Sequence, residues 1–283
     1  MKVVGYGDNV VDRYLNQNKM FPGGNCINFS VYAKRVGVDS AYLGKFGDDR
    51  EAEHIMRALK ELGIDISKCI VEEDSMTERC DVNIKEGNRE FVQFDERENL
   101  HDILQLGNSE LLYLKEFDLI HCSCYANEES EIPKLKAMPG LCTFDFSEEE
   151  EYRTEDYLNQ ICPYIDFALF SCERMKKEEI EELLNRVHEK GVQYVLATMG
   201  SDGQMLYDGN RYYTGKAKFI RAIDTMGAGD SFCTAFLMSL LKAGWKKKEA
   251  VKEETINEAL SYAADFAADN CLFEGSFGYA ANL

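Results

Sequence analysis

The residues with the clearest capacity for chemistry lie in one short segment, 224–230, which reads Asp-Thr-Met-Gly-Ala-Gly-Asp. The small residues Gly227, Ala228 and Gly229 allow a ligand to come close to the backbone. An apolar run with helical character follows at once, and the first turn of a helix has N–H groups without intrahelical acceptors. A helix that starts here therefore offers a binding site for an anion.

Asp230 is the last residue of this segment and stands beside the expected anion site. A carboxylate in that position can take a proton from a hydroxyl group while the hydroxyl oxygen attacks a phosphoryl group held by the amides. The same Gly-Ala-Gly-Asp sequence also describes an ordinary loop that ends in a helix N-cap. The segment by itself leaves both interpretations open.

A second polar segment lies near the N-terminus, where Gly23 and Gly24 precede the helical pattern that contains Asn28. Two adjacent glycines let backbone amides approach sugar hydroxyl groups, and the Asn28 amide can both donate and accept hydrogen bonds. Asp8 and Asp12 follow the first apolar run. Each feature also has a plain structural interpretation, as a glycine turn before a core helix or as an exposed loop acid.

Two segments of the chain resemble the signatures of the PfkB (ribokinase-like) carbohydrate kinases. Residues 224–236 resemble the second signature without an obvious departure. Residues 23–30, with Gly37 and Gly47 at the expected spacing, resemble the first signature. The resemblance covers the chain nearly end to end. It implies an ATP-dependent kinase in which Asp230 is the catalytic base and the amides of Gly227, Ala228 and Gly229 form the anion hole.

The resemblance also assigns residues to the sugar. It implies that the carboxylate of Asp12 accepts hydrogen bonds from two sugar hydroxyl groups. The other residues expected at the sugar are Asp8, Gly23, Gly24 and Asn28. Cys26 departs from the family, which usually has Gly or Ala there, so this departure bears on the shape of the sugar pocket and not on catalysis.

The nucleotide side is expected at segment 198–203, which follows a strand pattern and precedes a hairpin pattern. The resemblance places this loop near ATP, and the residues it implies are Thr198, Gly200, Gly203 and Asn270. It also implies Mg²⁺ with ATP, and a monovalent cation such as K⁺ held in part by Asp224. The family's Asn-x-x-Glu motif, which helps to organise Mg²⁺ and phosphate, reads Ser-Cys-Glu-Arg at 171–174, so the Mg²⁺ ligands are not assigned.

Within the family, the stretches 7–9, 144–147 and 223–227 are most similar to fructoselysine 6-kinases. This similarity implies fructoselysine as the phosphoryl acceptor and its 6-phosphate as the product. The alternatives are a fructokinase, ribokinase or nucleoside kinase of the same family, and a sugar sensor that kept the fold without turnover. An NAD-dependent dehydrogenase is disfavoured, because segment 5–10 lacks the third glycine of the dinucleotide fingerprint.

Composition and charge limit the partners of this chain of 283 residues. Asp and Glu total 51 against 32 Lys and Arg, which gives a formal net charge of −19. This charge argues against a nucleic-acid or acidic membrane surface and favours small-molecule partners, the sugar and ATP. The sequence has no long apolar run and no signal-peptide pattern, so we expect a cytoplasmic protein whose ten cysteines are reduced core thiols.

The spacing of apolar residues predicts the elements that must position these residues. Short runs that are apolar on both faces predict buried parallel strands at about 3–6, 41–44, 119–122, 141–146, 167–170 and 194–198. Helical periodicity predicts helices at about 51–62 and 173–190, each ended by a glycine. The alternation predicts an α/β fold, a doubly wound, mostly parallel sheet flanked by helices.

One region breaks the alternation of strands and helices. From about Thr77 to Arg97 the apolar residues alternate as in a hairpin, with Gly87-Asn88 at its turn. We therefore expect a single ribokinase-like domain over 1–283, with a small β lid formed by roughly 12–21 and 75–99 inserted in the α/β core. A homodimer through this lid is a further expectation.

Overall fold

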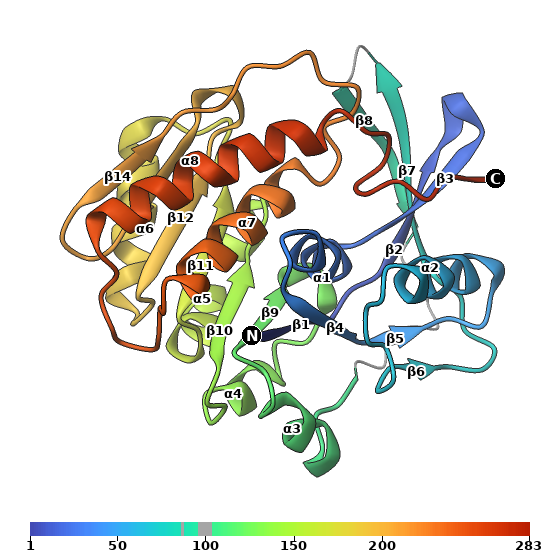
Figure 1. Ribbon diagram of the computed structural model, residues 1–283, viewed down its shortest axis with the longest axis horizontal. Coiled ribbons are helices and arrows are strands. Elements are labelled where there is room, and N and C mark those ends of the chain that lie inside the picture. The colour runs from blue at the N-terminus through green and yellow to red at the C-terminus, as the bar shows by residue number, and fades with distance from the viewer. Residues whose placement is uncertain (86–87, 96–103) are drawn as a thin grey trace.

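The computed structural model describes residues 1–85, 88–95 and 104–283. Within these residues the chain forms a large sheet flanked by helices, with a smaller sheet beside it (Figure 1). The large sheet has the order β14-β13-β12-β11-β10-β9-β1-β4. Its strands are β1 (Lys2–Tyr6), β4 (Asp39–Leu43), β9 (Leu119–Ser123), β10 (Leu141–Asp145), β11 (Phe167–Ser171), β12 (Tyr194–Thr198), β13 (Gln204–Tyr207) and β14 (Tyr212–Gly215).

The strands from β4 to β12 in this order run parallel, and β13 and β14 complete the sheet as an antiparallel hairpin. All the parallel strands predicted from apolar runs are confirmed. The prediction works because a strand covered by helices on both faces is apolar on both faces. In β1, for example, Val3 packs into the cluster on one face of the sheet and Val4 into the cluster on the other.

Helices cover both faces of the large sheet, as expected for a doubly wound α/β fold. The longer helices are α1 (Asn25–Arg35), α2 (Arg50–Glu61), α6 (Lys177–Glu189), α7 (Ala228–Lys242) and α8 (Glu253–Asn270). The shorter ones are α3 (Asn108–Leu114), α4 (Ile132–Leu135) and α5 (Glu155–Ile161). Side chains of α1, α7 and α8 share one hydrophobic core, whereas α3 to α6 contribute to the core on the opposite face.

Helix α6 begins four residues later than the sequence pattern predicts. Residues 172–175 form a turn in which the Met175 amide donates to the Cys172 carbonyl over 3.0 Å. The helix then starts where the Glu179 side chain accepts a hydrogen bond from the Lys176 amide over 2.9 Å, which satisfies an N–H group at the helix end. As a consequence, the segment 171–174 is a loop after β11 rather than part of a helix.

The smaller sheet has the order β15-β3-β2-β7-β8, and we call it the second sheet. Its strands are β2 (Val10–Tyr14), β3 (Lys19–Gly23), β7 (Glu78–Lys85), β8 (Asn88–Asp95) and β15 (Ala281–Asn282). The predicted hairpin is confirmed as β7 and β8, although Gly87 at its turn and Arg97 at its end lie outside the described residues. The segments expected to form the lid thus contribute to this sheet. Its last strand, β15, comes from the C-terminal segment and was not predicted.

Short elements complete the chain. Strands β5 (Lys45–Phe46) and β6 (Ile70–Val71) pair in parallel, and the 3₁₀ turns lie at Leu15–Gln17, Cys124–Ala126, Glu150–Arg153, Cys162–Tyr164 and Gly200–Asp202. All ten cysteines carry free thiols, and all but Cys69 are buried, in agreement with their expected place in the core. Among the described residues, the helices are either too short or too polar to span a lipid bilayer.

Candidate active site

The segment 224–230 forms the start of helix α7, as its glycines predict. Gly227 is the N-cap residue and has φ 71°, a left-handed conformation that favours glycine. The helix continues with Ala228 and Gly229, and Asp230 lies in its first turn. A Cβ atom on Gly229 would meet no other atom within 4 Å. The N-terminus of α7 therefore faces open space that a ligand can occupy.

Asp230 is paired with the other predicted segment through Asn28. The Asn28 side-chain amide donates a hydrogen bond of 2.6 Å to Asp230 Oδ2 across 202 residues of sequence. Asn28 lies in the first turn of α1, which packs beside α7. The two segments that carry the sequence signatures thus meet at one point, the adjoining N-terminal turns of α1 and α7.

The glycines before α1 stand against the two predicted sugar-side carboxylates. A Cβ atom on Gly23 would overlap Asp12 Oδ2, and one on Gly24 would come within 2.9 Å of Asp8 Oδ2. Asp8 accepts hydrogen bonds from the backbone amides of Asn25, over 2.6 Å, and Cys26, over 3.3 Å. Asp8 therefore caps the start of α1, while Asp12 lies on β2 of the second sheet.

Asp145 is a further member of the site that we did not predict from sequence. It lies at the end of β10, and its Oδ2 accepts a hydrogen bond of 2.9 Å from the Asn25 side chain. Burial and the negative charges of Asp230 and Asp8 raise the pKa of Asp145 to about 8. This shift favours the neutral form of the Asp145 carboxyl group, which reduces the negative charge near Asp230. The sequence signal was the similarity of stretch 144–147, at the end of a buried strand, to fructoselysine 6-kinases.

Asp224 is almost fully buried, and protein groups surround its carboxylate. It accepts hydrogen bonds from the Tyr14 hydroxyl over 2.7 Å, the Gly275 amide over 2.8 Å and the Met226 amide over 2.9 Å. A carboxylate offers about four lone-pair positions, so these donors take most of its capacity. The role of Asp224 in cation binding stays a prediction.

The loop predicted to lie on the nucleotide side connects β12 to β13. Gly200 has φ 55° and Gly203 has φ 96°, so both adopt conformations that favour glycine. A Cβ atom on Gly203 would overlap the carbonyl of Gly215, and one on Gly200 would lie 2.5 Å from Glu173 Oε1. Thr198 is the last residue of β12. This loop thus packs against the end of β14 and against the loop after β11.

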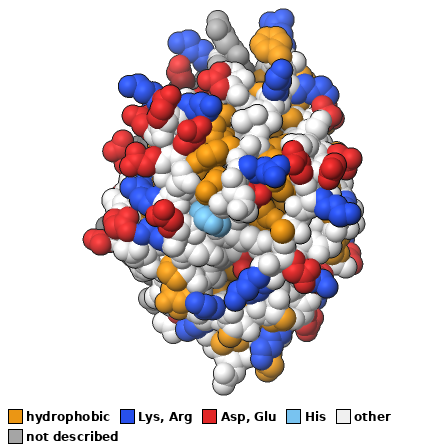
Figure 2. Space-filling view, turned by 90° about the vertical axis from the view of Figure 1, so that its left-hand side faces the viewer, with side chains coloured by type: hydrophobic (Ala, Val, Ile, Leu, Met, Phe, Trp, Pro, Cys, Tyr) orange, Lys and Arg blue, Asp and Glu red, His pale blue; other side chains and the backbone are white. Residues whose placement is uncertain are grey.

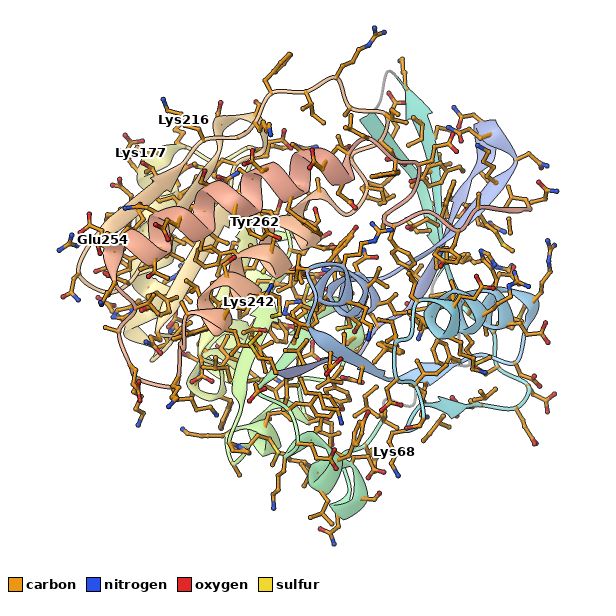
Figure 3. All side chains as sticks on the ribbon, viewed as in Figure 1. Lys68, Lys177, Lys216, Lys242, Glu254 and Tyr262 are labelled. Carbon is orange, nitrogen blue, oxygen red and sulfur yellow. The ribbon has the colours of Figure 1, made fainter. Side chains whose placement is uncertain are left out.

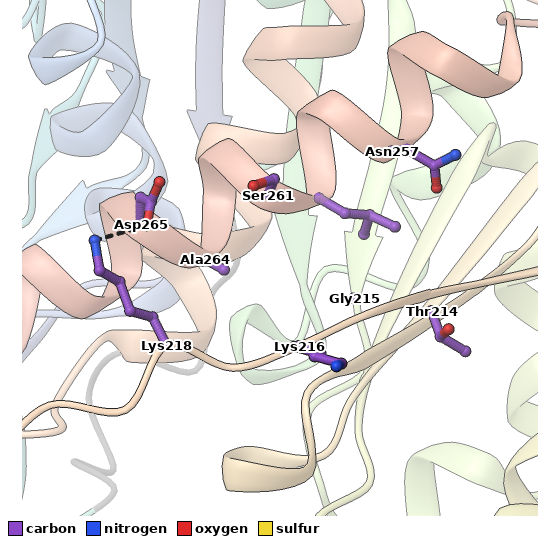
Figure 4. A pocket seen from close by; sticks show the side chains of 9 residues that line it. Thr214, Gly215, Lys216, Lys218, Asn257, Ser261, Ala264 and Asp265 are labelled. Carbon is purple, nitrogen blue, oxygen red and sulfur yellow. Dashed lines mark ion pairs between the residues drawn. The ribbon is translucent and has the colours of Figure 1, made fainter.

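A pocket of about 280 Å³ opens beside this loop, between the end of β14 and helix α8 (Figure 4). Its walls include Thr214, Gly215 and Lys216 from the strand side and Asn257, Leu260 and Ser261 from α8. Lys218 and Asp265 form an ion pair of 2.7 Å at the pocket. The pocket thus combines the apolar side chains of Leu260 and Ala264 with the basic side chain of Lys216 and the Lys218–Asp265 ion pair.

Basic and acidic side chains are interspersed around this region of the molecule. Lys216 extends from the segment after β14 at the outer edge of the molecule (Figure 3). The face on this side has hydrophobic side chains along its middle, with basic and acidic groups on both flanks (Figure 2). The net charge of −19 therefore does not gather into one acidic patch on this face.

Asn270, the remaining residue predicted at the nucleotide, lies at the C-terminal end of α8 and does not line this pocket. Its side-chain nitrogen donates to the Ser276 carbonyl over 2.9 Å and to the Tyr32 hydroxyl over 3.1 Å. Its side-chain oxygen accepts from Arg35 over 3.2 Å. Asn270 is thus engaged by protein groups on the α1 side, and its contact with nucleotide stays a prediction.

Comparison with known proteins identifies the family. Residues 1–275 match the pfkB family of carbohydrate kinases. The chain belongs to this family. Its members are carbohydrate kinases, so the chain is an ATP-dependent sugar kinase, and the predicted class of enzyme is confirmed. The alternatives outside this class, a dehydrogenase or a sensor without turnover, are accordingly not adopted.

Among curated relatives, a fructosamine kinase of Bacillus subtilis is 36% identical over 99% of this chain and 94% of its own length. A fructoselysine 6-kinase of Escherichia coli is 28% identical over 96% of this chain and 97% of its own length. The expected resemblance to fructoselysine kinases within the family is thus confirmed.

Solved structures share the fold at lower identity. A Vibrio cholerae fructokinase with bound fructose, ADP and calcium has a TM-score of 0.77 and 21% identity over 98% of this pfkB kinase and 95% of its own chain. A Xylella fastidiosa fructokinase with bound ATP has a TM-score of 0.81 and 16% identity over 98% and 94% of the two chains. The predicted ribokinase-like α/β fold is confirmed.

Proposed function

We propose that this sugar kinase phosphorylates fructosamines, with fructoselysine as the acceptor and O6 as the position of transfer. The observation that carries the proposal is the similarity to a fructosamine kinase at 36% identity along nearly the whole of both chains. Two of the stretches that resemble fructoselysine kinases contain Asp8 and Asp145, and these two residues meet at Asn25, which donates a hydrogen bond to each.

In the proposed reaction, Asp230 takes the proton of the acceptor hydroxyl group. The hydroxyl oxygen forms a bond to the γ-phosphorus of ATP, and the bond from that phosphorus to the β–γ bridging oxygen breaks, so that ADP leaves. The amides of Gly227, Ala228 and Gly229 at the start of α7 stabilise the charge on the transferred group. The hydrogen bond from Asn28 fixes the carboxylate of Asp230 in this position.

On the sugar side, Asp12, Gly23, Gly24 and Asn28 are proposed to contact the ring hydroxyl groups. Asp8, which accepts the backbone amides of Asn25 and Cys26, adds a negative potential at the start of α1. A fructosamine carries a protonated secondary amine beside its sugar, whereas free fructose has no cationic group. A negative potential therefore favours the fructosamine over the free sugar.

For the nucleotide, we propose that the loop with Thr198, Gly200 and Gly203 and the adjoining pocket receive ATP. Mg²⁺ is commonly held by one or two carboxylates together with substrate phosphates. Glu173 fits that requirement, because its carboxylate lies against Gly200. When bound, Mg²⁺ would neutralise phosphate charge, which a protein with so many acidic residues needs for ATP binding.

The proposed architecture is a single kinase domain over residues 1–283 with the second sheet as its lid. Strand β8 is at the edge of this sheet among the described residues, and its Phe91 and Val92 are 59% and 53% exposed. An exposed apolar edge strand supports the proposal of a homodimer through the lid.

We place the enzyme in the cytoplasm, where a chain with ten free thiols stays reduced.

The proposal is tested by steady-state assays of ADP release with fructoselysine, free fructose, ribose and adenosine as acceptors. We expect a kcat/KM for fructoselysine at least about tenfold above that of each other compound, which corresponds to about 1.4 kcal/mol of additional transition-state binding. The Asp230→Asn variant, assayed in parallel, measures ADP release that does not depend on the proposed base. A higher kcat/KM for free fructose or ribose would overturn the fructosamine assignment and leave the kinase class intact.

A further inference from the structure

The orientation of Asn28 at the catalytic base depends on a residue from the C-terminal segment. The Asn28 amide nitrogen donates to Asp230 Oδ2 over 2.6 Å and to Ser276 Oγ over 3.3 Å. Because an ionised carboxylate only accepts hydrogen bonds, the group that faces Asp230 must be the NH₂ group of Asn28. Its two protons then have two acceptors in fixed directions. Ser276 is completely buried, so water does not replace its hydroxyl group as the second acceptor.

Ser276 is held in turn by helix α1. Its backbone carbonyl accepts hydrogen bonds from the Tyr32 hydroxyl and, over 2.9 Å, from the Asn270 side chain. The same Asn270 nitrogen donates to the Tyr32 oxygen over 3.1 Å. Tyr32 is also completely buried. These three residues therefore form a closed set of hydrogen bonds, and each bond restricts the position of Ser276.

The Tyr32 hydroxyl also contacts the residue that begins the anion hole. A Cβ atom on Gly227 would overlap this hydroxyl oxygen and would lie 3.1 Å from Ser276 Cβ. Gly227, with φ 71°, has the left-handed conformation in which helix α7 starts. Tyr32 and Ser276 thus pack directly against the turn that sets the direction of the α7 amides. This pair of residues therefore contacts both Gly227, at the anion hole, and Asn28, which donates a hydrogen bond to Asp230.

We propose that Tyr32 and Ser276 are positioning residues for phosphoryl transfer, which together fix Asn28 against Asp230 and support the Gly227 turn. This inference rests on the proposed role of Asp230 as the base. Both side chains are completely buried, so they are proposed to act through Asn28 and Gly227 and not by contact with a substrate. Because the Asn28 amide nitrogen already donates to Asp230 and Ser276, the two residues are expected to act mainly through the base and the Gly227 turn. We therefore expect them to change kcat, while the KM for the acceptor, to which Asp12, Gly23 and Gly24 also contribute, changes little.

The variants Tyr32→Phe and Ser276→Ala each remove one oxygen atom with little change of shape. We expect each to lower kcat about tenfold with the KM for the acceptor within about twofold of wild type, because small errors of alignment have large effects on transfer. The double variant should lose little more than the stronger single variant, since residues that act as one unit are not additive. These kcat and KM values are measured with fructoselysine as the acceptor, or with free fructose if free fructose proves the better substrate.

Tyr194→Phe is the matched control. Tyr194 is 2% exposed, its hydroxyl accepts the Val251 amide over 2.9 Å, and it lies at the first residue of β12, the opposite end of that strand from Thr198. We expect this variant to keep kcat within about twofold, even where its thermal midpoint falls as far as that of Tyr32→Phe. The fraction of folded protein is measured for each variant at the assay temperature.

Three outcomes would overturn the inference: a normal kcat in folded Ser276→Ala, a rise of the acceptor KM at constant kcat, or an equal loss of kcat in Tyr194→Phe. If Tyr32→Phe does not fold, Ser276→Ala decides by the same criteria. Asp230→Asn separates this result from the proposed function. A near-normal kcat in that variant refutes the base itself, whereas an inactive Asp230→Asn with normal Tyr32→Phe and Ser276→Ala refutes only the positioning role.

Discussion

The junction of α1, α7 and the C-terminal segment differs sharply from the second sheet, although both border the proposed site. At the junction, Asn28 is 4% exposed and Tyr32 and Ser276 are completely buried, and hydrogen bonds join residues more than two hundred positions apart. In the second sheet, by contrast, Phe91 and Val92 on β8 are more than half exposed.

This difference indicates how the two regions divide the work of a kinase. Phosphoryl transfer needs groups held in a narrow range of positions. At the junction, several hydrogen bonds restrict the side chain of Asn28 and the position of Ser276. Acceptor selection needs a surface that can adapt to different sugars. In the second sheet the exposed edge strand β8 has that freedom, whereas β2, β3 and β7 have buried residues on both faces. We therefore expect variants at the junction to affect kcat for every acceptor, and variants of the second sheet to affect KM.

The largest effect is expected for Asp230→Asn at the junction. This change removes the proton acceptor and keeps the size of the side chain, and general-base assistance contributes roughly 10²- to 10⁴-fold. We expect kcat to fall at least about 100-fold for every acceptor, with ATP binding retained. Single-turnover kinetics and nucleotide titration measure the two quantities. A variant with a kcat near that of wild type would show that the base is elsewhere.

Gly229→Val should have the next largest effect. A Cβ atom at this position meets nothing within 4 Å, so the added side chain projects into the space expected for the phosphoryl group and disturbs the fold little. We expect kcat to fall roughly 100-fold, as for the loss of an oxyanion-hole donor. Gly244→Val is the control, because Gly229 and Gly244 both have open space at the Cβ position, and residue 244 lies beyond the far end of α7.

Gly244 has φ 91°, so its control variant is expected to lose thermal stability rather than kcat. Equal kcat values for wild type and for folded Gly229→Val would mean that the start of α7 does not approach the transferred group. That result would also contradict the assignment of phosphoryl transfer to the junction, because the junction would then have no anion site.

The smallest effect is expected in the second sheet, for Asp12→Asn on β2. Loss of one charged acceptor for sugar hydroxyl groups should raise the KM for the acceptor about tenfold, or about 1.4 kcal/mol, and change kcat less than about threefold. Glu90→Gln is the control for loss of charge, since this residue is exposed on β8. A fall of kcat without a rise of KM would show that Asp12 acts in phosphoryl transfer. The proposal that the second sheet serves acceptor binding and the junction serves transfer would then be wrong.

Local sequence was sufficient to predict the parallel strands of the large sheet, the β7–β8 hairpin and the chemical segments, but not strand β15 or the short helices α3, α4 and α5. The parallel strands were recognisable because burial on both faces makes them apolar throughout, and the start of α7 was recognisable because Gly227 and its neighbours can leave amides open to a ligand. The start of α6 was placed too early, since a turn and a cap at Lys176 compete with helical periodicity. The spacing of apolar residues alone does not show that residues 172–175 form a turn instead of the first turn of the helix.

Tertiary structure alone decided which residues meet. Sequence offered no reason to connect Tyr32 with Ser276, or Asp145 with Asp8, because a side-chain contact depends on how helices and strands pack and not on spacing along the chain. Asp224 is another example: nothing in the sequence indicated that Tyr14, Met226 and Gly275 donate hydrogen bonds to its carboxylate, and its expected role in cation binding stays a prediction. Sequence thus determined the chemistry that the residues can perform, and packing determined the partners with which they perform it, since hydrogen bonds are set by distances in space.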